Sequence, residues 1–177
     1  MLESQEIEKL LAEMRMFDEV MNNPTHHGNE LPHLRGTHAL IAKWNGHPVL
    51  QRAALCHNAY DIDRPGSFSQ REKLQLLIAP EAERIVYLFC ALSPRSLIQA
   101  TSKDQYVVND SYADAEIQLT REDMSALLTL ALANWLEQRP REAAIKQQSL
   151  LEEFRQARQF LPDYAYRDFM QAYGLVE

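Results

Sequence analysis

The chain of 177 residues is poor in glycine and cysteine and contains no long apolar run. It has five glycines and two cysteines, and its 25 acidic residues outnumber 18 basic ones to give a formal net charge of −7. Its apolar runs are far shorter than the roughly 20 residues that a membrane-spanning helix needs. These deficits argue against a membrane protein and against broad binding to a nucleic-acid backbone, which requires clustered lysine and arginine.

Both cysteines, Cys56 and Cys90, lie in apolar stretches of the sequence. Two buried thiols in a reducing compartment explain this pattern better than a disulfide or a nucleophile does. The N-terminal residues 1–14 are acidic and amphipathic, unlike a secretory signal peptide. We therefore expect a cytoplasmic protein.

Several motifs of common enzymes are missing. The chain has no glycine-rich phosphate loop, no paired-cysteine zinc motif and no nucleophile elbow. The β-branched alternation that is typical of strands is almost absent, so the sequence predicts an all-α fold. The length suits a single domain over 1–177, with an N-terminal helix in 1–22, a core in 27–138 and C-terminal helices in 140–177.

Prolines and capping residues mark the expected helix starts, because a first-turn proline loses no hydrogen bond and a capping box pairs the free N–H groups. The first helix is expected over 3–21, and residues 101–119 are expected to form an ordered loop rather than a strand. The other expected helix starts are Pro32, Pro48, Ser69 with Glu72, Pro80, Pro94, Thr120 with Asp123, Pro140 and Pro162.

Two histidines stand out among the residues that are present. His33 lies in the first turn of one expected helix, and His57 lies near the last turn of the next. The connection around Asn45 is short, which makes the two helices antiparallel neighbours and brings the imidazoles together. Two convergent imidazoles form half of a metal site. Packing offers the other interpretation, favoured by spacing alone, in which His33 is exposed and His57 is a hydrogen-bonded core residue.

This stretch resembles the HD superfamily of metal-dependent phosphohydrolases, in which a helix-borne histidine is followed, at a similar distance, by a His-Asp pair. Residues 27–95 resemble more closely an uncharacterised HD-like family, with weaker similarity through 134–138. The resemblance implies an HD-like helical bundle with additional terminal helices. It rests on His27, His33-Leu34, Gly36-Thr37, Trp44, Ala53, His57 with Tyr60, the run Glu81-Ala82-Glu83-Arg84 and the run Tyr87-Leu88-Phe89-Cys90.

Two positions depart from the superfamily pattern. Asn58 replaces the aspartate of the His-Asp pair, and Asn134 falls where the resemblance implies the last aspartate of the metal set. A neutral amide is a weak ligand for a divalent cation. We therefore do not expect an ordinary HD phosphohydrolase, and we expect the two amides to act through hydrogen bonds. Tyr60 is either a hydrogen-bond donor in the site or a core residue.

A cluster of three histidines offers a replacement ligand set, because HD-like oxygenases use extra histidines. His27 precedes His33 by six residues and completes this set with His57. The other candidate side chains have plainer interpretations. Asp61 and Asp63 are expected as turn formers, Glu81 and Glu83 as surface charges at a helix start, and His26, His38 and His47 as surface residues.

The sequence thus predicts an HD-like small-molecule enzyme with hydrolase or oxygenase chemistry. One divalent ion of iron, manganese or zinc would activate water or oxygen, and without a metal a histidine would act as general acid or base. The alternative is a degenerate, non-catalytic HD-like protein that binds a ligand or a partner protein. The aromatic C-terminal helix is expected to pack in the core, with a homodimer face as the second interpretation. The predicted site comprises His33, His57, Asn58, Tyr60 and Asn134, with His27, His33 and His57 as metal ligands.

Overall fold

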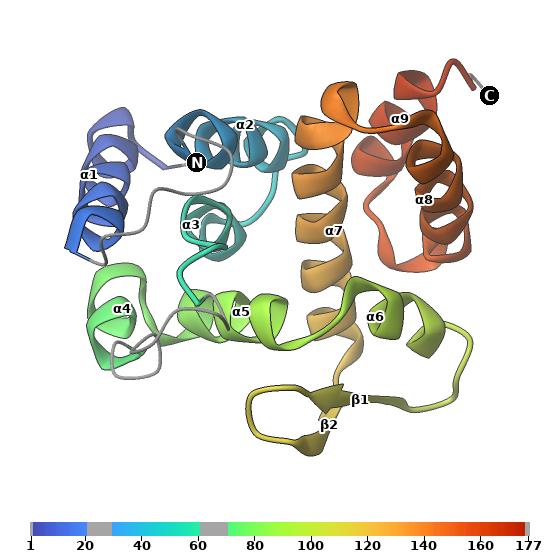
Figure 1. Ribbon diagram of the computed structural model, residues 1–177, viewed down its shortest axis with the longest axis horizontal. Coiled ribbons are helices and arrows are strands. Elements are labelled where there is room, and N and C mark those ends of the chain that lie inside the picture. Colours follow the sequence, from blue (N-terminus) through green and yellow to red (C-terminus); the bar gives the residue numbers. More distant parts are fainter. Residues whose placement is uncertain (1, 21–29, 61–70, 176–177) are drawn as a thin grey trace. The chain divides into compact units, whose positions relative to one another are not determined.

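The computed structural model describes residues 2–20, 30–60 and 71–175 of the chain. In these residues the protein is mostly helical, with nine α-helices and one small two-stranded antiparallel sheet (Figure 1). The all-α prediction is confirmed in the main. No helix in the described part of the chain is both long and apolar enough to cross a membrane.

The contacts divide the chain into two compact units, Met1–Cys90 and Ala91–Glu177. The division falls inside the predicted 27–138 core, so a single domain over 1–177 stays a prediction, and each unit is described by itself. The helices of the first unit are α1 (Ser4–Val20), α2 (Glu30–Lys43), α3 (Pro48–Leu55), α4 (Arg71–Ile78) and α5 (Pro80–Ala91). The starts at Pro48 and Pro80 are confirmed, whereas the Ser69 cap lies outside the described residues.

A tight turn between α2 and α3 makes the two helices a hairpin. Asn45 adopts a left-handed conformation with φ of 56°, and the Gly46 N–H donates to the Ile41 carbonyl at 2.9 Å. This pattern is a Schellman C-cap, which satisfies carbonyls at the helix end. Gly46 is required because an added Cβ would lie 2.9 Å from the Ile41 carbonyl oxygen. Pro48 then starts α3 in its first turn.

The first unit has a core of apolar side chains between α1, the α2–α3 hairpin, α4 and α5. Two ion pairs join α1 to the hairpin, Arg35 with Glu8 at 2.6 Å and Arg52 with Glu6 at 2.7 Å. Both are exposed or half-exposed, so the buried apolar area contributes more of the stability than they do. The core consists of Leu10, Leu11, Leu34, Ile41, Trp44, Ala53, Ala54, Leu55, Leu74, Ile78, Ala82 and Val86.

The second unit is arranged around α7, which is buried nearly all round. Residues 127–133 of α7 are all buried, as expected of a helix that is apolar on every face. The capping box predicted at Thr120 with Asp123 is confirmed. The elements of the second unit are α6 (Pro94–Ala100), β1 (Tyr106–Asp110), β2 (Ala115–Leu119), α7 (Arg121–Gln138), α8 (Ala144–Gln156), α9 (Asp163–Ala172) and the 3₁₀ turns Arg139–Arg141 and Arg158–Phe160.

The expectation of a loop at 101–119 is wrong, because β1 and β2 form a hairpin there. Val108 pairs with Ile117 and Tyr106 with Leu119, so the apolar residues share one face of the ribbon. Asp110 fixes the turn by accepting hydrogen bonds from the backbone N–H groups of Tyr112 and Ala113 at 2.9 and 3.0 Å. Apolar and polar residues alternate in 115–119, which is typical of a strand. The polar side chains on the other face of the ribbon lower the overall hydrophobicity of the segment, so the pattern is easily missed.

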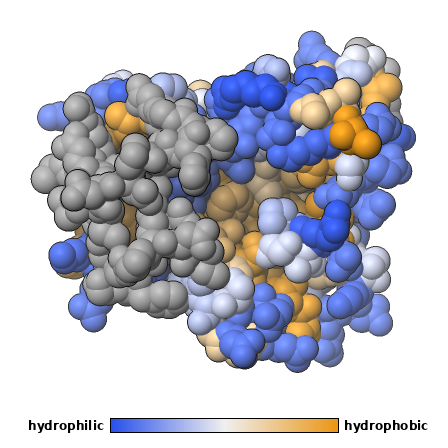
Figure 2. Space-filling view, viewed as in Figure 1, coloured by the Kyte–Doolittle hydropathy of each residue, from blue (hydrophilic) through white to orange (hydrophobic). Residues whose placement is uncertain are grey.

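The helix expected to start at Pro140 starts later, and its last turn is of the 3₁₀ type. Pro140 lies in a 3₁₀ turn, α8 begins only at Ala144, and a second 3₁₀ turn ends at Phe160. Core packing of the last helix is confirmed for Phe169, which is fully buried. Figure 2 shows a largely hydrophilic surface over α8 and α9, with separate apolar patches.

Candidate functional site

The imidazoles of His33 and His57 meet in the first unit, as the hairpin argument predicts. Their Nε2 atoms lie 3.1 Å apart, and their ring centroids are 5.0 Å apart at an interplanar angle of 76°. His57 is fully buried and His33 is half-buried. One face of the pair is therefore shielded from water by the fold, and His33 forms its more accessible side.

The contact of the second ring nitrogen of His57 indicates which tautomer the ring adopts. Nδ1 of His57 lies 2.8 Å from the Ala54 carbonyl oxygen. Because a carbonyl oxygen only accepts hydrogen bonds, Nδ1 must carry the proton, and Nε2 of the neutral ring holds a lone pair directed at His33. A hydrogen bond from the remote nitrogen to a carbonyl is the usual support of a metal-binding histidine.

The position of His57 differs from the expectation. Helix α3 ends at Leu55, and Cys56 caps it by donating its backbone N–H to the Ala53 carbonyl. His57 therefore lies two residues beyond the helix. The ring of His57 instead satisfies the Ala54 carbonyl at the helix end. Burial raises the pKa of the Cys56 thiol to about 12, so this cysteine is an inert core residue, as predicted.

Helix α5 holds His57 from the other side. The ring of Phe89 packs edge-on against the His57 ring, with centroids 5.5 Å apart, and the Cys90 thiol donates to the His57 carbonyl at 3.0 Å. Cys90 is half-buried rather than buried. His57 is thus fixed through its ring, its Nδ1 and its backbone before any ligand binds.

The spacing of the two Nε2 atoms suits a shared metal ion. Two nitrogens bound at about 2.0–2.1 Å lie about 3.3–3.4 Å apart in tetrahedral geometry and about 3 Å apart at adjacent octahedral positions. The observed 3.1 Å lies between these values. The described ranges contain no group of three histidine, cysteine or acidic side chains that could hold a metal ion. Within the described ranges, the two imidazoles are therefore the only side chains of these kinds that the geometry offers to an ion at this place.

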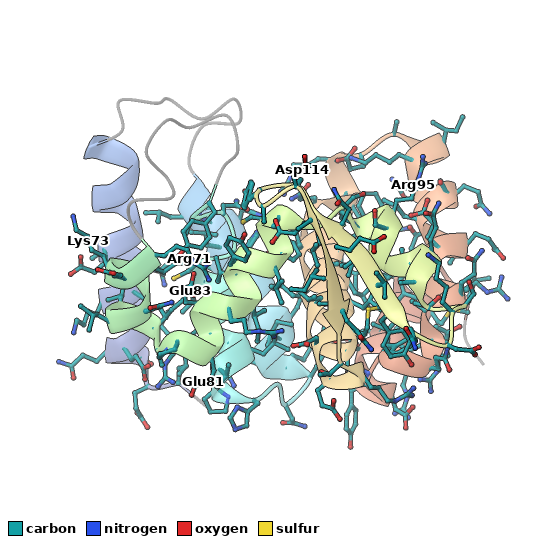
Figure 3. The ribbon with its side chains drawn as sticks, turned by 90° about the horizontal axis from the view of Figure 1, so that it is seen from below. Arg71, Lys73, Glu81, Glu83, Arg95 and Asp114 are labelled. Atoms are coloured by element: carbon teal, nitrogen blue, oxygen red, sulfur yellow. The ribbon has the colours of Figure 1, made fainter. Side chains whose placement is uncertain are left out.

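A second polar cluster is centred on Glu83 of α5. Its carboxylate is only 1% exposed and accepts hydrogen bonds from Tyr60 Oη at 2.8 Å, from Gln75 Nε2 at 2.9 Å and from Arg71 Nε and Nη2 at 2.7 and 3.1 Å. Figure 3 shows Arg71 and Glu83 side by side. The Arg71 guanidinium also stacks on the Tyr87 ring at 3.9 Å. We refer to these five residues as the Glu83 cluster.

The expectation that Glu83 is a surface charge is wrong, whereas Glu81 is indeed exposed. Burial raises the pKa of the Glu83 carboxyl, but hydrogen bonds from Arg71, Gln75 and Tyr60 outweigh burial and hold this pKa below its ordinary value. Burial and the neighbouring carboxylate raise the pKa of Tyr60, so its hydroxyl stays protonated and donates. The available sequence signal was the shared helix face of Glu83, Tyr87 and Cys90, four and three residues apart.

Tyr60 therefore has a defined role in the fold. Its hydroxyl donates to Glu83, so it ties the segment after α3 to α5 three residues beyond His57. Asn58 is half-buried beside His57 in the chain. Asn134 belongs to the second unit, where its Oδ1 accepts a hydrogen bond from Gln138 at 3.0 Å. The predicted third ligand His27, together with His26, Asp61 and Asp63, lies outside the described residues.

His38 is a further correction, because it is buried rather than on the surface. Only 7% of His38 is exposed, and burial lowers its pKa, against a smaller opposing effect of a hydrogen bond with Gln51. His38 lies four residues after Leu34 and three before Ile41, both fully buried, so helix periodicity places it on the buried face of α2. His47 is exposed as predicted and caps α3 through Nδ1.

Comparison with known proteins gives one match. Residues 16–94 match the model of a domain of unknown function, DUF6817, over somewhat less than half of the chain. The matching range contains His33, His57 and Glu83. Searches of curated proteins and of solved structures found no match.

Proposed function

We propose that this chain is an HD-like small-molecule enzyme whose site holds one divalent metal ion between His33 and His57. The observation that supports this proposal is the 3.1 Å distance between the two Nε2 atoms, with the His57 lone pair fixed by the Ala54 carbonyl. An iron, manganese or zinc ion held there would polarise water, oxygen or a substrate oxygen for hydrolase or oxygenase chemistry. We expect the enzyme to act in the cytoplasm.

The residues of the chain have separate roles in this proposal. His57 is the rigid ligand, because its ring is buried and held at Nδ1. His33 is the ligand on the accessible side, where a small-molecule substrate would approach. Asn58 and Tyr60 remain proposed site residues of the first unit, and His27 remains the proposed third ligand. Without a metal, one histidine of the pair would act as general acid or base toward a substrate. The other imidazole would orient it through the contact between the two Nε2 atoms.

Elemental analysis of protein purified without chelator tests this proposal. We expect about one equivalent of metal per chain in the wild type and a clearly lower metal content in His33→Ala and in His57→Ala, because each variant lacks one proposed ligand. His47→Asn is the matched control, because it removes an exposed imidazole while asparagine keeps the cap of α3. Equal metal content in all four proteins would contradict the proposal.

A non-catalytic ligand-binding protein is the second candidate. Asn58 stands in place of the aspartate of the related motif, and the described residues contain no third ligand beside the pair. This candidate predicts metal-free protein that is thermally stabilised by small molecules in a screen, with the stabilisation lost in His33→Ala. Metal bound stoichiometrically at the pair would exclude it in favour of the enzyme.

A further inference from the structure

Thr37 of α2 carries a buried hydroxyl that has no hydrogen-bond partner among the described residues. It is fully buried, and its Oγ1 makes no hydrogen bond with any described residue. A threonine inside a helix can bond the carbonyl four residues earlier, which here belongs to His33. Thr37 does not make this bond, so its hydroxyl is available to a group outside the helix.

The place of Thr37 relates this hydroxyl to the histidine pair. Thr37 follows His33 by four residues in α2, so the two side chains lie on one face of the helix, with Cβ atoms about 5–6 Å apart. His33 Nε2 is already directed at His57 at 3.1 Å. The unpaired hydroxyl therefore lies on the same helix face as the imidazole pair.

An unpaired buried hydroxyl is unfavourable unless it has a partner that the protein itself does not supply. Nine-tenths or more of buried polar groups are hydrogen-bonded to protein or to ordered water. Removing such a hydroxyl with an isosteric apolar group is therefore neutral or stabilising for the fold. An ordered water molecule is the simplest partner for such a hydroxyl.

We propose that the Thr37 hydroxyl binds a water molecule held at the His33–His57 pair, and so acts as a further polar group of the site. This inference rests on the proposed function, since the water would contact the imidazole pair and would become a ligand of the metal ion when one is bound. A neutral hydroxyl suits this role because it both donates and accepts hydrogen bonds. Thr37 would orient the water without adding a charge to the site.

The test compares Thr37→Val, which removes the hydroxyl at nearly constant shape, with Thr37→Ser, which keeps it. Co²⁺ alone is the probe, titrated into full-length, metal-free protein and followed by its visible absorption. We expect Thr37→Val to weaken Co²⁺ binding about tenfold and Thr37→Ser to leave it within about twofold of the wild type. We also expect the melting temperature of metal-free Thr37→Val to equal or exceed that of the wild type.

The imidazole ¹⁵N signals of His33 and His57 in metal-free protein give a second readout. We expect the His33 signal to shift in Thr37→Val and to stay in place in Thr37→Ser. Equal Co²⁺ affinity and unchanged signals in both variants would overturn the role of Thr37 while keeping the metal site. No Co²⁺ uptake by the wild type, with a valine-specific shift of His33, would overturn the metal site and support the water.

Discussion

At the scale of single residues, a buried carboxylate is tolerated only when its oxygens are fully used. Glu83 meets this condition, since Tyr60, Gln75 and Arg71 occupy both oxygens. Hydrogen bonds to an ionised group are stronger than neutral ones, and an unpaired buried charge is strongly destabilising. The Glu83 cluster therefore holds the segment that carries His57.

Removing the Tyr60 hydroxyl weakens this cluster without creating a cavity. We expect Tyr60→Phe to lower the free energy of unfolding by about 1–2 kcal/mol, because Glu83 loses one donor while remaining paired with Arg71. Urea denaturation at neutral pH measures this change. Tyr164→Phe is the control, since Tyr164 is 58% exposed and should change stability by less than about 0.5 kcal/mol. Equal effects of the two variants would show that the bond to Glu83 contributes nothing.

The charge of Glu83 adds a pH dependence to stability. Its folded-state pKa lies below the ordinary value of 4.5, so its contribution is present above that pH and is lost as the pH falls through the lowered pKa. We expect Glu83→Gln to cost about 2–3 kcal/mol at pH 7, less than a fully buried broken pair because Arg71 is partly exposed. The difference from the wild type should shrink below pH 4.5.

Urea denaturation between pH 7 and pH 3 measures this profile. Glu81→Gln is the matched control, because Glu81 is exposed in the same first turn of α5. We expect it to leave the profile nearly unchanged. If the difference in unfolding free energy between the wild type and Glu83→Gln stays the same at acid pH, the charge of Glu83 does not stabilise the fold.

The positions of single residues could be predicted from sequence where the connection between two helices determines them. They could not be predicted where the packing of helices distant in sequence determines them. The short α2–α3 connection decides the meeting of His33 with His57, and that prediction is confirmed. Glu81 and Glu83 look equivalent in sequence, since both lie in the first turn of α5 and complement its dipole. Only the packing of α4 against α5 distinguishes them, through Arg71.

At the scale of elements, the turn between α2 and α3 sets the geometry of the site. A change in this turn alters how the start of α2 meets the end of α3. An added Cβ at Gly46 would lie 2.5 Å from Cγ2 and 2.9 Å from the carbonyl oxygen of Ile41. The backbone atom cannot yield easily, so the hairpin must shift.

We expect Gly46→Ala to lower the free energy of unfolding by about 1–3 kcal/mol, the usual cost of overpacking. The shift should also weaken Co²⁺ binding at the histidine pair, measured by the same titration. Gly174→Ala is the control, because Gly174 has φ of 70° with no atom within 4 Å of an added Cβ, so it tests backbone strain alone. Unchanged Co²⁺ affinity in Gly46→Ala would contradict the claim that the α2–α3 turn sets the geometry of the histidine pair.

Helix starts were predictable because proline and capping side chains act within one turn of the chain. Pro80 and Thr120 illustrate this local signal. The hairpin β1–β2 was missed because its pairing joins residues up to 13 positions apart, as in Tyr106 with Leu119. Half of its side chains face water, which obscures the apolar alternation of a strand.

At the scale of the whole molecule, the described part of the candidate site lies in the first unit. His33, Thr37, His57 and the Glu83 cluster all belong to it, whereas Asn134 belongs to the second. The sequence predicted the helical class because apolar periodicity reports the type of element. The division at Cys90 depends on which helices pack together, and neither spacing nor composition encodes that directly.

X-ray absorption of the zinc-loaded, full-length protein tests the central claim most directly, because it counts the ligands around the ion. The account predicts one zinc per chain with at least two imidazole nitrogens at about 2.0–2.1 Å. It also predicts the loss of this imidazole signal in His57→Ala. A zinc environment without imidazole, or one that is identical in His57→Ala, would contradict the claim that His33 and His57 share one metal ion.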